Sequence, residues 1–177
     1  MCIRDRETAT FSMYCFWTGE KKLGNVNGVL ETQPGFMNGR EVVEVKYNPI
    51  LISYEDLVTE AKSASCASHV FTENNNQITK AEKVVGKNKV SKKSKFRLDK
   101  EPKYYLSRSV YRFIPMTPTQ AVKVNVKIGS GQSPDEFLSP RQLELLDFIQ
   151  KNPKQKWKSA INVDLVKAWS EVEELIS

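Results

Sequence analysis

The order of apolar and polar positions in the first sixty residues predicts a strand, a helix, two further strands and a second helix. An apolar run leads into a polar run whose one apolar contact is Leu23, which is typical of a strand followed by a short helix. Ser53, with Asp56 three residues later, is a strong N-cap for the second helix. The expected elements are a strand over 10–16, a helix over 19–27, a strand over 29–33 ended by Pro34-Gly35, a turn over 36–39, a strand over 41–47 and the helix after Ser53.

This β-α-β-β-α order is most of a ferredoxin-like module, in which helices pack on a sheet. We therefore expect an α+β (α/β) fold with additional helices at the C-terminal end. The strand over 41–47 is the clearest, because most of its residues are β-branched or aromatic.

Two short segments in the C-terminal half predict helix starts. Thr117-Pro118-Thr119-Gln120 and Ser139-Pro140-Arg141-Gln142 each combine a hydroxyl N-cap, a proline at the first helical position and a glutamine at the third. Apolar residues at helical spacing follow the second segment. Residues 122–128 after the first segment alternate as in a strand, and we favour a helix there. A last helix is expected over 162–176.

These elements predict an α/β domain over 7–128 and a C-terminal helical extension over 129–177. We expect the Lys-rich segment 83–95 to be a basic, mobile loop. The net charge of +6 is concentrated around it, because residues 83–103 hold nine Lys or Arg residues and two acidic ones. A local basic segment favours a solvated loop over a basic binding face, so a nucleic-acid partner is not expected. Contact with an acidic partner and adventitious nucleic-acid binding are the alternatives.

No apolar run approaches the roughly 18 residues of a membrane span, and no signal-peptide pattern follows the charged start. We therefore expect a cytoplasmic protein without membrane contact, and a monomer. Residues 1–6 follow no structural pattern, and Cys2 is set aside with them as a remnant of sequence assembly.

The chemistry that the sequence offers centres on Cys15. This residue lies between the first expected strand and the helix after it, where the helix dipole and unpaired backbone N–H groups favour a thiolate over a thiol. Phe16 and Trp17 follow directly and offer an apolar wall. The remaining candidates, Cys66 and His69, show no metal-ligand spacing, so we expect no metal site.

The residues around Cys15 resemble the signature of the peptide methionine sulfoxide reductase A family. That signature is a GCFWG segment followed by a helix, a GV-x-x-T-x-x-GY-x-x-G turn and a GHAEVVEV strand. The matching residues are Cys15-Phe16-Trp17, Glu20, Gly28-Val29, Thr32, Gly35-Phe36, Gly39 and Glu41-Val42-Val43-Glu44-Val45. Further on, Asp99 and Tyr104 keep the family's D-x-x-x-x-Y spacing. The resemblance covers residues 11–58 and, with fewer matches, 99–120.

The chain also departs from the family's pattern. Tyr14 and Thr18 stand where the family has glycines. The long loop before Arg40-Glu41, which in the family contributes a tyrosine near the substrate oxygen, is missing. Lys103 and Tyr105 replace the glutamine and arginine that flank the later tyrosine, and the usual C-terminal resolving cysteines have no counterpart.

The resemblance implies a thiol-dependent reductase of methionine sulfoxide, free or in peptides. Cys15 would attack the sulfoxide, and Glu41, kept protonated by an apolar wall, would donate the proton. Tyr104 would hydrogen-bond the substrate oxygen, and Asp99 would orient that tyrosine or a water molecule.

Phe16 and Trp17 would then hold the S-methyl group. The sulfenic acid left on the enzyme would be reduced by Cys66 or by an external thiol or thioredoxin, without a cofactor. Two other readings stay open: a non-catalytic ferredoxin-like binding or metal-handling module, and an RNA-binding sheet based on the Tyr and Lys content.

Overall fold

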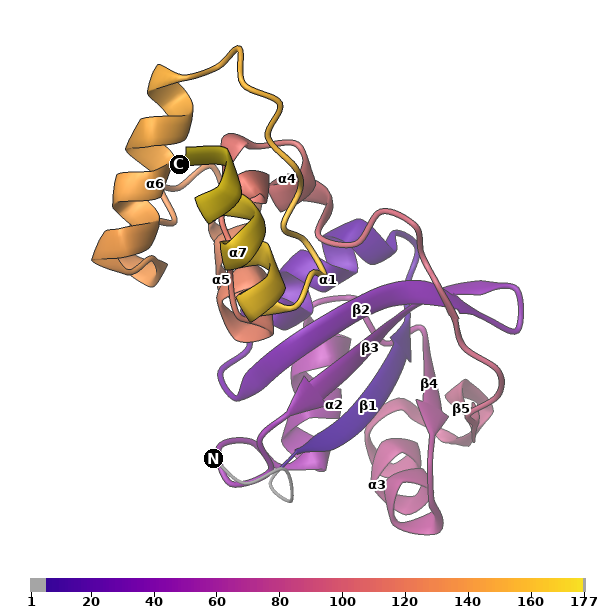
Figure 1. Ribbon diagram of the computed structural model, residues 1–177. Coiled ribbons are helices and arrows are strands. Elements are labelled where there is room, and N and C mark those ends of the chain that lie inside the picture. Colours follow the sequence, from indigo (N-terminus) through magenta and orange to yellow (C-terminus); the bar gives the residue numbers. More distant parts are fainter. Residues whose placement is uncertain (1–5, 177) are drawn as a thin grey trace. The chain divides into compact units, whose positions relative to one another are not determined.

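The computed structural model describes residues 6–176 (Figure 1). The expectation about Cys2 and residues 1–5 lies outside the described residues. Contacts divide the chain after Lys100 into two compact units, which we call unit 1 and unit 2 and describe separately.

Unit 1 opens with the predicted β-α-β-β-α order, which confirms the expected α+β class. Its elements are β1 (Glu7–Ser12), α1 (Phe16–Gly24), β2 (Val29–Met37), β3 (Arg40–Tyr47), α2 (Tyr54–Ser63), β4 (His69–Thr72), α3 (Asn75–Val85), the 3-10 turn η2 (Lys87–Lys89), β5 (Val90–Lys92) and β6 (Arg97–Leu98). Ser53 caps α2 by accepting a hydrogen bond from the Asp56 N–H, as predicted.

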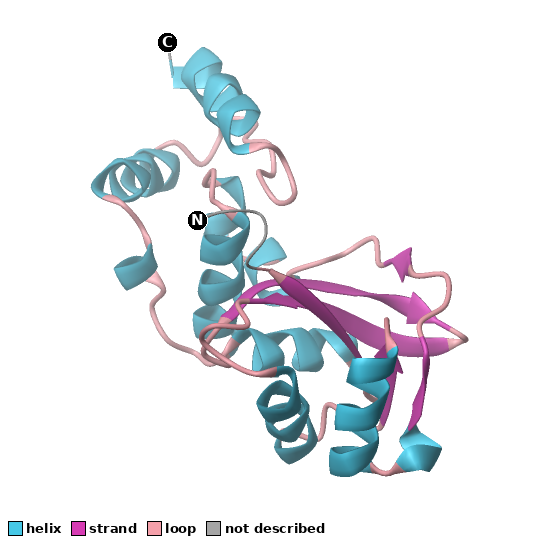
Figure 2. Cartoon of the chain, turned by 90° about the horizontal axis from the view of Figure 1, so that it is seen from below, coloured by secondary structure: helices cyan, strands magenta, loops and turns pink. Residues whose placement is uncertain are grey.

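Within residues 6–176, six strands form one sheet in the order β5-β4-β1-β3-β2-β6. All neighbouring pairs are antiparallel except β4 with β5. Figure 2 shows the strands as one curved layer. Alternate residues of β1 and β3 therefore face the helices, and the residues between them face the other side.

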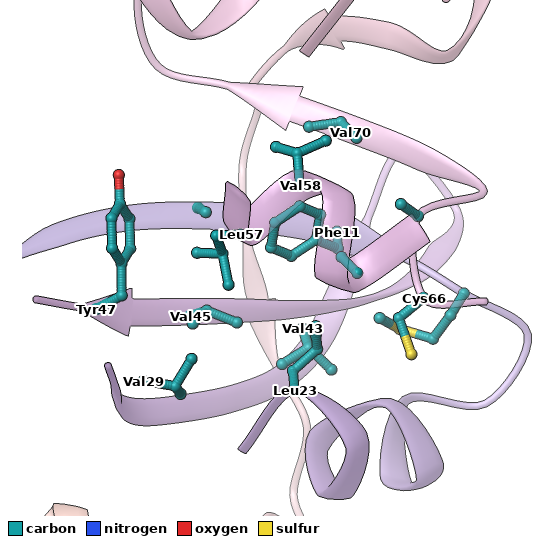
Figure 3. Close-up of a cluster of buried hydrophobic side chains, with 14 of the residues drawn as sticks. Phe11, Leu23, Val29, Val43, Val45, Tyr47, Leu57, Val58, Cys66 and Val70 are labelled. Atoms are coloured by element: carbon teal, nitrogen blue, oxygen red, sulfur yellow. The ribbon is translucent and has the colours of Figure 1, made fainter. Parts of the chain in front are cut away.

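The main core of unit 1 lies between this sheet and α1, α2 and α3. Phe11 from β1, Val43 and Val45 from β3, and Leu57 from α2 are fully buried there (Figure 3). A smaller cluster on the other face of the sheet joins Met37, Val42 and Phe71, with Phe96 packed against it. The segment after β5 thus covers part of the second face.

The first helix begins earlier than the sequence pattern predicts. The first strand ends at Ser12 and α1 begins at Phe16, whereas a strand to residue 16 and a helix from residue 19 were expected. Gly19 lies inside α1, where an added Cβ would come within 2.9 Å of the Met13 side chain. The glycine therefore lets α1 pack closely on the chain that leaves β1.

The prediction that β2 ends at Pro34 is wrong, because the strand continues to Met37. A proline cannot donate to a neighbouring strand, but it is tolerated near a sheet edge. Here β6 begins to pair at Gly35, and the Pro34 carbonyl accepts a hydrogen bond from the Asp99 N–H at 2.9 Å. The turn therefore shrinks to Asn38 and Gly39, both with positive φ.

The expected mobile loop over 83–95 is ordered instead. Residues up to Val85 complete α3, and β5 pairs in parallel with β4, with Val90 opposite Val70. Lys93 then forms ion pairs with Glu44 at 2.6 Å and Glu73 at 2.9 Å. β5 pairs with the edge of β4, which lies about twenty residues earlier in the chain. The lysine content of residues 83–95 does not reveal this partner.

Unit 2 is helical. Its elements are α4 (Tyr104–Ser107), η3 (Val110–Phe113), α5 (Pro118–Gly129), η4 (Asp135–Phe137), α6 (Pro140–Lys151) and α7 (Leu165–Ile176). Both predicted helix starts are confirmed as complete capping boxes, Thr117 with Gln120 and Ser139 with Gln142. The alternating segment after Thr117 is a helix.

The division of the chain falls after Lys100, whereas the sequence pattern suggested residue 128. Residue 128 lies inside α5, whose Val124 shares a core with Leu106 of α4 and Leu146 of α6. A boundary at residue 128 would cut through this core. Among residues 6–176, no helix has the length and apolar character required to cross a membrane.

Candidate active site

Cys15 is the N-cap residue of α1, at the point where the chain leaves β1. Its backbone is extended, with φ −132° and ψ 111°, and its carbonyl accepts a hydrogen bond from the Gly19 N–H at 2.9 Å. Its side chain is half-buried and makes no capping hydrogen bond. The thiol therefore lies at the positive end of a helix, without a bond that would occupy it.

Glu41 reaches the same helix terminus from β3. The pairing of Ser12 with Val42 puts the start of β3 beside the chain that enters α1, and the Met13 N–H donates to the Glu41 carbonyl at 3.3 Å. The Glu41 carboxyl oxygen Oε2 accepts a hydrogen bond from the Phe16 N–H at 2.8 Å. The carboxyl group is thus anchored at the residue that follows Cys15.

Rings from two elements form the apolar wall. The Phe16 and Trp17 rings have their centroids 5.7 Å apart, and Phe36 from β2 meets Phe16 edge-on at 5.2 Å. Phe16 is buried and Trp17 is half-buried. Sequence reasoning did not name Phe36 as a site residue, although its place in the matched Gly35-Phe36 pair was a usable signal.

Asp99 lies beside Trp17. The indole nitrogen Nε1 of Trp17 is 3.5 Å from the Asp99 carboxyl oxygen Oδ2, a long and therefore weak hydrogen bond. The Asp99 backbone is held by its bond to the Pro34 carbonyl. Within unit 1, Asp99 thus contacts the tryptophan of the expected cage. Its expected part in orienting a tyrosine or a water molecule stays a prediction.

Tyr104 belongs to unit 2 and is therefore not placed relative to Cys15. It is the first residue of α4, its ring meets Tyr105 edge-on at 5.3 Å, and the Arg108 guanidinium lies 3.6 Å from its ring centroid. Its expected part in the site stays a prediction.

Cys66 lies in the core of unit 1, with 2% of its surface exposed (Figure 3). Its thiol donates a long bond of 3.5 Å to the Ala64 carbonyl, which also accepts from the Lys22 ammonium at 2.8 Å. Burial raises the pKa of the Cys66 thiol, and the Lys22 charge opposes that shift. Burial therefore disfavours the thiolate that would have to attack.

In the part of the chain that the structure describes, residues 6–176, no group of three or more His, Cys, Asp or Glu side chains could hold a metal ion.

The chain is similar to curated peptide methionine sulfoxide reductases MsrA. The protein from Methanococcus maripaludis strain C6 is 38% identical over 69 aligned residues, which cover 29% of this chain and 44% of the relative. The aligned part of the chain is thus related to MsrA. The protein from Thermoactinomyces vulgaris is 33% identical over 88 residues, covering 40% of this chain and 63% of the relative. No protein-family model matches the chain.

The likeness is therefore partial: the chain matches about half of the length of these MsrA relatives. Among solved structures, Mxr1 from Saccharomyces cerevisiae in complex with Trx2 is 16% identical, with a TM-score of 0.41, and the match covers 58% of this chain and 87% of that one.

The missing MsrA loop has a structural counterpart in the turn between β2 and β3. Met37 pairs directly with Arg40, so Asn38 and Gly39 alone connect the strands, with φ of 50° and 72°. Both residues are exposed. A two-residue turn with positive φ at both positions matches the twist of a hairpin, so the strands close without the longer loop.

Proposed function

We propose that this chain reduces methionine sulfoxide at Cys15, with Glu41 as the proton donor. The hydrogen bond of 2.8 Å between the Phe16 N–H and the Glu41 carboxyl is the observation that carries the proposal. It joins the Glu41 carboxyl group to the residue next to the candidate nucleophile, although Glu41 and Phe16 lie 25 positions apart in the chain. The partial MsrA relationship supports the same residues.

The proposed chemistry begins with the Cys15 thiolate, which attacks the sulfoxide sulfur. Oxide is a poor leaving group, so the oxygen needs a proton as the bond to the substrate sulfur breaks. Glu41 in its carboxylic acid form supplies that proton from Oε1 while Oε2 keeps its bond to Phe16. The attack forms a bond between the two sulfurs, and the oxygen leaves the substrate sulfur with its proton as hydroxide. Hydroxide then attacks the Cys15 sulfur and the sulfur–sulfur bond breaks. The products are the thioether and a Cys15 sulfenic acid, so the substrate gains the two electrons that the cysteine loses.

The ring wall gives the substrate methyl group an apolar surface. Phe16, Trp17 and Phe36 lie in contact with one another, and Asp99 bonds the indole of Trp17. We propose that these rings hold the S-methyl group and that Asp99 fixes the tryptophan. Tyr104 is proposed to bond the oxygen, as the resemblance implies.

Two routes would return Cys15 to the thiol. An external thiol or thioredoxin condenses with the sulfenic acid, releasing water, and a second thiol then reduces the mixed disulfide. The alternative is Cys66, which would need the core around it to open because its thiol is buried. We favour the external route. Reducing conditions in a cytoplasm would suit it, in line with the location that the sequence predicts.

The test is turnover of L-methionine S-sulfoxide with dithiothreitol as the reductant. We expect methionine to form with wild-type protein and not with Cys15→Ser, while Cys66→Ala keeps most of the activity. Dimedone should trap a sulfenic acid on Cys15 when substrate is added without the thiol.

The outcome against this proposal is equal, slow substrate loss with wild type and Cys15→Ser. Circular dichroism of both proteins checks that the variant is folded. If activity persists in Cys15→Ser and disappears in Cys66→Ala, the nucleophile has been assigned to the wrong cysteine.

A further inference from the structure

The pairing of β6 with β2 brings a cation to the ring wall. Arg97 is paired with Phe36 in the antiparallel register, so the two side chains lie next to each other on one face. The Arg97 guanidinium carbon is 4.4 Å from the Phe36 ring centroid. Gly35 permits this approach, because a Cβ there would lie 2.5 Å from the Arg97 carbonyl oxygen.

A short series of contacts connects this cation with Cys15. The Phe36 ring meets the Phe16 ring, and Phe16 is the residue after Cys15. Asp99, two residues beyond Arg97 and so on the same face of the extended chain, reaches Trp17. Arg97 and Asp99 therefore both contact rings of the proposed methyl-binding wall: Arg97 contacts Phe36, and Asp99 contacts Trp17.

The guanidinium group is available to a ligand. Arg97 is exposed, and among residues 6–176 no hydrogen bond or ion pair engages its side chain; its contact with Phe36 leaves the N–H donors unused. A guanidinium presents a planar fork of donors that matches a carboxylate.

A substrate that carries a carboxylate needs a positively charged group at this site. Glu41 and Asp99 both bring carboxyl groups to the first turn of α1. A further negative charge on the substrate would be repelled by Asp99 unless a cation offset it. Arg97 supplies a positive charge on the same wall.

We infer that Arg97 binds the α-carboxylate of the substrate, which rests on the proposed function. The preferred substrate is then methionine sulfoxide with a free carboxylate, either the free amino acid or the C-terminal residue of a peptide. A methionine side chain is short, so its carboxylate stays close to the sulfur and within the same wall. Arg97 acts in binding and takes no part in the chemical step.

The experiment compares kcat and KM for three S-sulfoxides: L-methionine sulfoxide, its N-acetyl derivative and the N-acetyl methyl ester. The first two keep the carboxylate and the ester lacks it. For wild type we expect kcat/KM to be about 10- to 100-fold higher with the carboxylates than with the ester, the range for a charge-assisted hydrogen-bonded pair. The difference should appear in KM. Preference for the free amino acid over its N-acetyl derivative would separate the two sources of the carboxylate.

In Arg97→Gln this preference should disappear, because kcat/KM for the two carboxylates falls to about the value for the ester. Circular dichroism checks that the variant is folded. Arg97→Lys, which keeps the charge and loses the fork, should fall between wild type and Arg97→Gln. Lys80→Gln is the matched control: it removes one positive charge on α3, from a pocket that is also lined by Glu7 at the opposite end of β1 from Cys15. It should leave the preference intact.

Equal kcat/KM for acid and ester in an active wild type would overturn the inference and leave the proposed function standing. So would a preference that Arg97→Gln retains. Absence of turnover with all three sulfoxides would remove the proposed function, and the inference with it.

Discussion

The Glu41 carboxyl group on β3 accepts the backbone N–H of Phe16, the first residue of α1, at 2.8 Å. One carboxyl oxygen thus holds the start of α1, and the other is the one that we propose for proton transfer. Glu41→Gln keeps an oxygen that can accept from Phe16 and removes the acid. We expect a loss of about 10²- to 10⁴-fold in kcat, the usual range for a general acid, with the stability nearly unchanged. Steady-state kinetics and urea unfolding check both parts.

Glu41→Leu should show the same kinetic loss and also lower the unfolding free energy by about 0.5–2 kcal/mol, because Phe16 loses its acceptor at a helix start. Glu60→Gln, on the exposed face of α2, is the control for removing one carboxylate. Wild-type kinetics in Glu41→Gln would exclude Glu41 as the proton donor.

Gly35 and Gly39 lie close together in β2 and its turn, and alanine should destabilise each for a different reason. At Gly35 a Cβ would lie 2.5 Å from the Arg97 carbonyl oxygen and 2.6 Å from the Phe96 ring, so β6 has to move. We expect a cost of about 1–3 kcal/mol, as for overpacking. At Gly39 a Cβ meets nothing within 4 Å, but the φ of +72° is strained for alanine, at about 1 kcal/mol.

Hydrogen exchange separates the two effects. The Asp99 amide, which bonds the Pro34 carbonyl at 2.9 Å, should exchange faster in Gly35→Ala and at the wild-type rate in Gly39→Ala. If the Asp99 amide exchanged at the same rate in both variants, the pairing of β6 with β2 would not depend on the absence of a side chain at Gly35.

Two buried tyrosines should make unit 1 sensitive to alkaline pH. Burial raises the pKa of Tyr47, and its hydrogen bond of 2.5 Å to Glu7 adds to the shift; burial also raises the pKa of Tyr54. Above roughly pH 10 the unfolded chain loses tyrosine protons that the folded chain retains. The contribution of these tyrosines to the unfolding free energy should therefore be fully present below that pH, and it should be lost as the pH rises further.

Phenylalanine variants distinguish the two tyrosines. The Tyr54 hydroxyl is buried and has no hydrogen-bond partner, so Tyr54→Phe should be neutral or stabilising by up to about 1 kcal/mol. Tyr47→Phe loses the bond to Glu7 and should cost about 1–2 kcal/mol at neutral pH. Urea unfolding at about pH 8 and about pH 10.5 should show a smaller alkaline loss in each variant than in wild type. An unchanged alkaline loss in both would place the sensitivity elsewhere.

The two described cysteines should react with thiol reagents at very different rates. In a Cys2→Ser background, Ellman's reagent should label Cys15 quickly, because its side chain is half-exposed at the start of α1. Cys66 should react only as fast as the core opens, because it is buried and burial raises its thiol pKa. Two kinetic phases are expected, and the slow one should speed up in urea and vanish in Cys66→Ala. A single fast phase from both thiols would contradict the burial of Cys66.

Local signals in the sequence predicted the parts of the fold that depend on neighbouring residues. The hydroxyl of Ser53 and the capping boxes at Thr117 and Ser139 determine where three helices begin, because a cap is satisfied within four residues. The β-branched run of β3 likewise identified its strand. The order of apolar and polar positions was enough for the α+β class and for placing Cys15 before a helix.

The two wrong predictions, at Pro34 and over residues 83–95, both concern strands whose pairing partner is distant in the sequence. A proline ends most strands, but β2 continues through Pro34 to pair with β6, and the N–H of Asp99, the residue after β6, donates to the Pro34 carbonyl. The lysines of 83–95 are typical of a loop, yet β4 offers an edge to which β5 can bind. Neither partner is visible from the residues nearby.

The sequence by itself therefore determined the order of the first five elements, the starts of α2, α5 and α6, and the candidate nucleophile, since these follow from contacts within a turn or two of chain. Only the tertiary structure decided which groups surround that nucleophile. The register of β1 with β3 brings Glu41 to Phe16, and the register of β2 with β6 brings Arg97 to Phe36. Pairing of distant strands sets these registers, and a shift of one residue would turn each side chain to the other face of the sheet.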